Sequence, residues 1–151
     1  MILIKKVEQY EDHYVHLCEP IKNNIISDGI FFRIIYSTQD VTLNGIYLLI
    51  ELKNVMCEKH YNKYKYSFNV NAHNDVIDNI KKIEESLLNK IKINKNPCFK
   101  IYEQFTNGNV KLFTESPSNK NIRVVLKMSG IWENETNYGL TYKFIHIREG
   151  C

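Results

Sequence analysis

The stretch Ile122–Ile147 reads "IRVVLKMSGIWENETNYGLTYKFIHI" and holds the single tryptophan of the chain. Apolar residues alternate with polar and cationic ones along its first half, which predicts a strand with one face in the core. A polar turn separates this run from a second, aromatic-rich run, so the stretch predicts a hairpin that closes the fold. Trp132 joins the core face if the register is regular, whereas a bulge at Gly130 turns it outward. The pattern leaves both orientations open.

Three upstream segments also have the composition of strands. Ile30–Ser37 is rich in aromatic and β-branched residues, which favour pleated structure. Ile46–Leu52 is apolar at nearly every position, so we expect a central strand with both faces covered. In Lys63–Val70 aromatic and polar residues alternate, which predicts aromatic rings on one face and lysines on the other.

One helix is predicted between these strands and the terminal hairpin. Apolar residues recur at helical spacing from Val76 to Ile91. Asn74 or Asp75 can cap its first turn by accepting backbone N–H bonds. Pro97 lies beyond its end, where a helix cannot continue.

A second hairpin is predicted over Phe99–Glu115, "FKIYEQFTNGNVKLFTE". Asn107-Gly108 tolerates the positive φ angles of a two-residue turn. Counting outward from that turn places two aromatic residues opposite each other, with lysines on the same face. This predicted face carries Lys100, Tyr102, Gln104, Lys111 and Phe113.

The order of these segments predicts a single domain over residues 1–151, mainly β with one α-helix. Its length and its apolar fraction of 44% suffice for a substantial core. Several strands, a helix and about four further strands suit an OB-fold-like small β-barrel. A β-sandwich carrying one helix is the alternative.

Charge and sorting signals restrict the partners of the chain. Lys and Arg number 20 against 17 Asp and Glu, which gives a net charge of +3. This charge is too small to indicate a nucleic-acid partner by itself, so such a signal has to come from local clustering of basic residues. The first residues lack the pattern of a secretory signal, and no segment reaches the length of an apolar membrane span. We therefore expect an intracellular protein that makes no membrane contact.

The chain shows no recognisable catalytic or metal-binding motif. No histidine lies beside an evident nucleophile, and the Gly-rich phosphate-binding loops are missing from the sequence. Cys57 and His60 have C-x-x-H spacing, but no second ligand pair lies near them in sequence. The sequence therefore predicts no enzymatic activity, no cofactor and no metal. Free thiols are expected at Cys18, Cys57, Cys98 and Cys151.

The interleaving of aromatic residues with lysines is the strongest functional signal. Single-stranded nucleic acid stacks its bases on aromatic rings, at about 1–3 kcal/mol for each base, while cations follow its phosphates. The alternative interpretation is that strand tyrosines are half-buried packing residues. The candidate stacking residues are Tyr102, Phe113 and Trp132. The candidate phosphate contacts are Lys100, Lys111, Arg123, Lys127 and Lys143, and Lys63 and Lys65 form a second basic cluster.

The blocks "SGIWE" (Ser129–Glu133) and "YGLTYKF" (Tyr138–Phe144) are the most distinctive of the sequence. With the segments upstream from Gly29 onward, they resemble single-stranded-DNA-binding proteins of nucleocytoplasmic large DNA viruses, such as African swine fever virus and related giant viruses. The resemblance implies an OB-like core and sequence-tolerant binding of single-stranded DNA, or of RNA, in viral DNA replication or repair. It implies action in the host cytoplasm, at the viral factory, or in the nucleus. A homo-oligomer is also compatible with the sequence, which does not determine the oligomeric state. A viral structural or protein-interaction module that binds no nucleic acid is the alternative.

Overall fold

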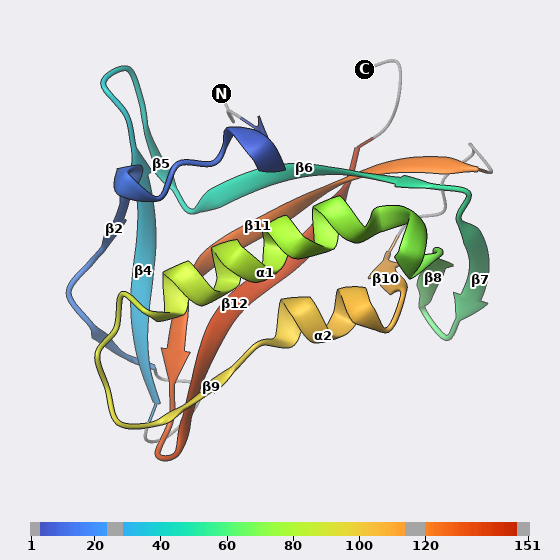
Figure 1. The fold of residues 1–151 in the computed structure, drawn as a ribbon. Helices are drawn as coiled ribbons and strands as arrows, with labels where there is room; N and C mark the ends of the chain where they lie inside the picture. Colours follow the sequence, from blue (N-terminus) through green and yellow to red (C-terminus); the bar gives the residue numbers. More distant parts are fainter. Residues whose placement is uncertain (1–3, 24–28, 114–119, 148–151) are drawn as a thin grey trace.

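The structure, a computed structural model, describes residues 4–23, 29–113 and 120–147, and these form a mainly β fold with one long helix and two sheets (Figure 1). The strands are β1 (Lys5–Lys6), β2 (Val15–Leu17), β3 (Ile21–Asn23), β4 (Gly29–Ser37), β5 (Thr42–Asn44), β6 (Ile46–Lys53), β7 (Met56–His60), β8 (Lys63–Ser67), β9 (Asn96–Cys98), β10 (Asn109–Leu112), β11 (Asn121–Glu133) and β12 (Asn137–His146). The helices are α1 (Asn74–Leu88) and α2 (Lys100–Thr106), and three short 3-10 helices are η1 (Val7–Gln9), η2 (Asp12–Tyr14) and η3 (Val70–His73).

The predicted terminal hairpin is confirmed and forms the centre of the main sheet. β11 pairs with β12 along nearly its whole length on one side. On the other side its first half pairs with β6 and its second half with β4. Val124 and Leu126 are buried on the inner face, as the alternation in the sequence predicts.

A β-bulge in β11 determines which way the tryptophan points. The register to β12 shifts between Met128 and Gly130, so one residue is inserted into β11. Even-numbered residues face the core before the bulge, whereas Ile131 does so after it. Trp132 therefore lies on the opposite, outer face, where it is half-buried. The structure thus answers the question that the sequence pattern leaves open.

The predicted helix is confirmed as α1, which lies across the inner face of β11 and β12 (Figure 1). Its apolar stripe is buried, with Ile80 and Leu87 at the centre. The N-terminal segment is bonded to the C-terminal end of α1 through Asp12. The carboxylate of Asp12 accepts hydrogen bonds from Ser86 at 2.6 Å and from Lys90, just beyond the helix, at 3.0 Å. No helix within the described ranges has the length and apolar character needed to cross a lipid bilayer.

The coarse fold class is confirmed, but the barrel is not. The main sheet runs β1-β6-β11-β12-β9, with β2, β3 and β5 attached through β4, and its ends do not meet within the part of the chain described. A separate small sheet has the order β10-β8-β7. The structure is therefore mainly β with one long helix, and it establishes neither an OB-fold-like barrel nor a sandwich.

The second predicted hairpin is wrong, because Lys100–Thr106 is helix α2. Ile101 and Phe105 are both buried, and a separation of four residues puts them on one face of either a helix or a strand. Asn107-Gly108 ends the helix: Asn107 is its C-cap and Gly108 has a φ of +78°. β10 pairs with β8.

Candidate nucleic-acid interface

An open groove of about 780 Å³ lies between α2, β8, β10 and the later part of β12, and we call it the basic groove. Its lining has five lysines and one glutamate. The lysines come from β8, from the consecutive elements α2 and β10, and from β12, three parts of the chain that folding brings together. The lining residues are Lys63, Lys65, Lys100, Glu103, Gln104, Asn107, Asn109, Lys111, Phe113, Tyr142, Lys143 and Phe144.

Two of these lysines stand directly opposite each other on neighbouring strands. Lys65 of β8 is the cross-strand partner of Lys111 of β10. Like charges in such a pair destabilise the sheet. Lys100 is paired with Glu103 at 3.9 Å, but Lys63, Lys65, Lys111 and Lys143 form no ion pair with any carboxylate among the described residues. An anion between the opposed lysines would relieve their repulsion.

Phe113 presents an aromatic ring at the end of the groove. Its side chain is 70% exposed, which is uncommon for a phenylalanine. The ammonium of Lys63 lies 5.1 Å from the ring centroid, a cation–π contact. The groove therefore holds one strongly exposed aromatic ring, and its lining also carries five lysines.

Tyr102 does not face Phe113, so the predicted cross-strand aromatic pair is wrong. Tyr102 lies on α2, half-buried against the core. The ammonium of Lys81, which belongs to α1, lies 5.3 Å from the centroid of its ring. The ring therefore packs between the two helices and does not line the groove.

The side of the groove formed by β12 carries a neutral phenol. Tyr142 donates a hydrogen bond from its hydroxyl to Oε1 of Gln104, at 2.9 Å. Burial raises the pKa of Tyr142, and the nearby carboxylates of Glu84 and Glu103 raise that pKa further. Tyr142 therefore adds no negative charge to this surface at neutral pH.

A buried carboxylate positions α2, which forms one wall of the groove. Glu84 of α1 accepts bonds from the backbone N–H groups of Ile101 at 3.1 Å and Tyr102 at 2.9 Å. The N–H groups in the first turn of a helix have no acceptor within the helix itself. The N-cap residue of α2 makes no side-chain capping bond, so Glu84 caps this helix in its place. Burial raises the pKa of Glu84, although the two backbone donors oppose that rise.

We expect Glu84→Gln to change how the free energy of unfolding depends on pH. Because the folded state raises this pKa, the folded protein binds the proton more tightly than the unfolded chain does. The stability of the wild-type protein should therefore fall, relative to the variant, as the pH rises above the ordinary carboxyl value of 4.5. Urea unfolding of both proteins across this range measures the difference. Parallel pH profiles for the two proteins would contradict the prediction.

The remaining predicted site residues lie on the outer face of the main sheet. Trp132, Arg123 and Lys127 all belong to β11 and point away from α1. The Nε atom of Arg123 lies 4.0 Å from a carboxylate oxygen of Glu51. Lys143 is the cross-strand partner of Lys127 and also lines the basic groove. Apart from Tyr102, the predicted residues are thus divided between two surfaces that share Lys143.

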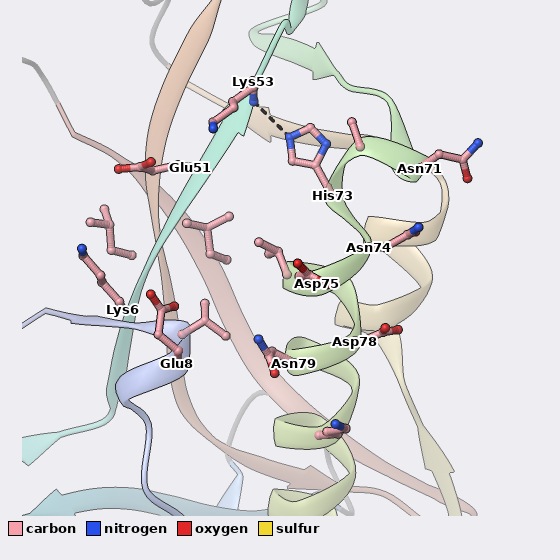
Figure 2. A pocket seen from close by; sticks show the side chains of 16 residues that line it. Lys6, Glu8, Glu51, Lys53, Asn71, His73, Asn74, Asp75, Asp78 and Asn79 are labelled. Carbon is pink, nitrogen blue, oxygen red and sulfur yellow. Dashed lines mark hydrogen bonds between the residues drawn. The ribbon is translucent and has the colours of Figure 1, made fainter.

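A larger pocket, of about 930 Å³, lies beside the start of α1 and holds a buried histidine (Figure 2). Nε2 of His73 accepts a bond from the backbone N–H of Lys53 at 3.0 Å, and Nδ1 lies 2.7 Å from the carbonyl oxygen of Asn69. Both ring nitrogens are thus used by the backbone, which is a structural role. Figure 2 shows Glu51 and Asp78 on opposite walls, pointing away from each other.

Nothing in the described ranges forms a metal site, since no group of three or more His, Cys, Asp or Glu side chains converges there. Cys57 and His60 both lie on the exposed strand β7. Cys18, Cys57 and Cys98 are free thiols, and Cys151 lies outside the described residues.

Sequence reasoning missed Asn107, Asn109 and Tyr142 as residues of the groove. The first two carry no pattern that separates them from other surface amides. Tyr142 belongs to a strand whose neighbours in space could not be counted from the sequence. No family model, no curated protein and no solved structure matches the chain.

Proposed function

We propose that the protein binds single-stranded DNA in the basic groove, without strong sequence preference. The observation that carries this proposal is the convergence of five lysines, from α2 and three strands, on one open surface with a single glutamate. Ammonium groups contact phosphates, and phosphates are the same at every position of the strand.

The chemistry of the groove suits a single strand better than a duplex. A single strand can turn its bases outward, and an exposed ring such as Phe113 can stack on a base of any identity. The bases of a duplex are stacked on each other and offer no free face to the ring. The pair Lys65 and Lys111 supplies two cations at one place, and a backbone phosphate would neutralise their mutual repulsion.

The resemblance to the DNA-binding proteins of large DNA viruses supports the same proposal. It extends the proposal to a role in viral DNA replication or repair, in the host cytoplasm or nucleus. The OB-fold-like barrel that it implies remains a prediction, because the described strands form an open sheet. The groove needs no closed barrel, since α2, β8, β10 and β12 already form its walls.

A salt titration with an oligo-dT strand tests the proposal. We expect the logarithm of the binding constant to fall linearly with the logarithm of salt concentration, by about 0.7 for each phosphate neutralised. Fluorescence anisotropy of a labelled strand measures this slope. A duplex of the same length is the control, and weaker binding of the duplex is expected. Absence of binding at low salt, or a slope near zero, would remove the proposal.

A second candidate is a structural or protein-interaction module, and one observation favours it. Every residue of β7 is exposed, and β7 is one of the two edge strands of the small sheet. Met56 is 70% exposed and Tyr61, at the turn that follows β7, is 86% exposed. A partner chain could pair with such an edge. A stable oligomer in light scattering, with Tyr61 shielded and no affinity for oligo-dT, would support this candidate.

A further inference from the structure

The outer face of the main sheet carries a cross-strand pair of aromatic residues that the sequence does not reveal. Phe31 of β4 is the cross-strand partner of Trp132, and Trp132 is the partner of Gly139 in β12. Directly opposed residues of an antiparallel pair share a face of the sheet. Arg33 is opposed to Gly130 and lies on the same face as Phe31, two residues away.

Two glycines leave the room that these rings occupy. A Cβ atom on Gly130 would lie 2.2 Å from Cζ of Phe31, and one on Gly139 would lie 2.9 Å from Cζ2 of Trp132. Each ring therefore lies over bare backbone, which no residue other than glycine provides. Phe31 and Trp132 are both half-buried, so part of each ring remains open to solvent. The arrangement is a low aromatic platform on the sheet.

Cations flank this platform and connect it to the basic groove. Lys127 and Lys143 stand opposite each other on β11 and β12, a second like-charge pair. The ammonium of Lys127 lies 5.4 Å from the ring centroid of Tyr47, on β6. β12 pairs with β9 only from Asn137 to Gly139. On that side Lys143 therefore has no neighbouring strand among the described residues, and there it also lines the groove.

We propose that the outer face is a second contact surface for the same DNA strand, which passes from the basic groove around the free edge of β12. Phe31 and Trp132 stack on bases, while Arg33, Lys127 and Lys143 contact phosphates. This inference rests on the proposed function and extends it from one surface to two. The charge of this face favours an anionic strand as the occupant. Four of its cationic side chains are those of Arg33, Arg123, Lys127 and Lys143. The carboxylate of Glu51 lies on the same face, but it already pairs with Arg123.

The single tryptophan makes this face directly observable. Its emission is measured while wild-type protein is titrated with oligo-dT of about 4 and about 16 nucleotides, lengths that span the known range for one small binding domain. We expect the longer strand to quench Trp132, because a stacked base contacts the indole. We also expect Phe31→Leu, which still covers Gly130 but has no flat ring, to weaken binding of the longer strand about tenfold. Circular dichroism confirms that this variant is folded.

Three further measurements separate the possible outcomes. Tyr61→Ala removes an exposed ring outside both surfaces and should bind as the wild type does. If the short strand binds with the expected salt slope, but the long strand leaves Trp132 unchanged and Phe31→Leu has no effect, this inference fails and the groove proposal stands. If neither strand binds, both fail. A change in Trp132 emission with protein concentration alone, together with a dimer mass, would show that a second copy covers the face and would overturn the inference.

Discussion

The double variant Lys65→Glu/Lys111→Glu is expected to bind single-stranded DNA roughly 100-fold more weakly than the wild-type protein, about 1.4 kcal/mol for each lysine. Both side chains line the basic groove and oppose each other across β8 and β10. The change removes two phosphate contacts and places two carboxylates where the backbone would lie. Fluorescence anisotropy with oligo-dT at low salt measures the affinity. The slope of binding against salt should also decrease, since fewer counterions are released.

The matched control is Lys82→Glu/Lys92→Glu, which changes the net charge by the same amount. Both lysines are exposed, one on α1 and one just beyond it, and neither lines the groove. If binding depended on overall charge alone, the two double variants would lose affinity equally. Equal losses would therefore contradict the groove as the binding site.

The single variant Lys111→Glu separates binding from stability. Lys65 already faces Glu58 of β7 on its other side, and it would then face an opposite charge on β10 as well, which stabilises a sheet by about 0.2–1 kcal/mol. We expect this variant to have a higher Tm than the wild type and a lower affinity for DNA. A purely structural role for the pair predicts the first effect without the second.

Phe105→Ala is expected to lower the free energy of unfolding by about 3–5 kcal/mol, and Tm by roughly 10 °C. Phe105 is 0% exposed and anchors α2 to the core. Its ring centroid lies 5.9 Å from that of Phe68 and 5.7 Å from that of Phe144. Truncation leaves a cavity where α2 meets the sheet. Urea and thermal unfolding measure the loss.

Tyr61→Ala is the control for this prediction, because Tyr61 is the most exposed large hydrophobic residue among those that the structure describes. A surface substitution of this kind should change stability by less than about 0.5 kcal/mol. A loss below about 1 kcal/mol for Phe105→Ala would mean that α2 is not held by its buried ring. The helical assignment of Lys100–Thr106, and with it one wall of the groove, would then need revision.

The sequence alone determined the elements whose periodicity is long and unambiguous. The terminal hairpin shows alternation over many residues, and α1 shows helical spacing over four turns. In each element the apolar residues recur with one period, and only a strand or only a helix with that period buries all of them on a single face. The outward direction of Lys63 and Lys65 followed from the same rule, since Tyr64 between them is half-buried and Tyr66 beside them is buried.

Tertiary contacts alone decided α2, the direction of Trp132 and the assembly of the groove. The spacing of Ile101 and Phe105 fits either a helix or a strand, and the choice depends on Glu84, which caps α2 from another helix. Trp132 turned outward because β11 contains one extra residue opposite β12. The five lysines of the groove come together through strand pairing and helix packing between distant segments. A local pattern specifies which face of an element is apolar, whereas the neighbour of each face is set by the minimum free energy of the whole chain.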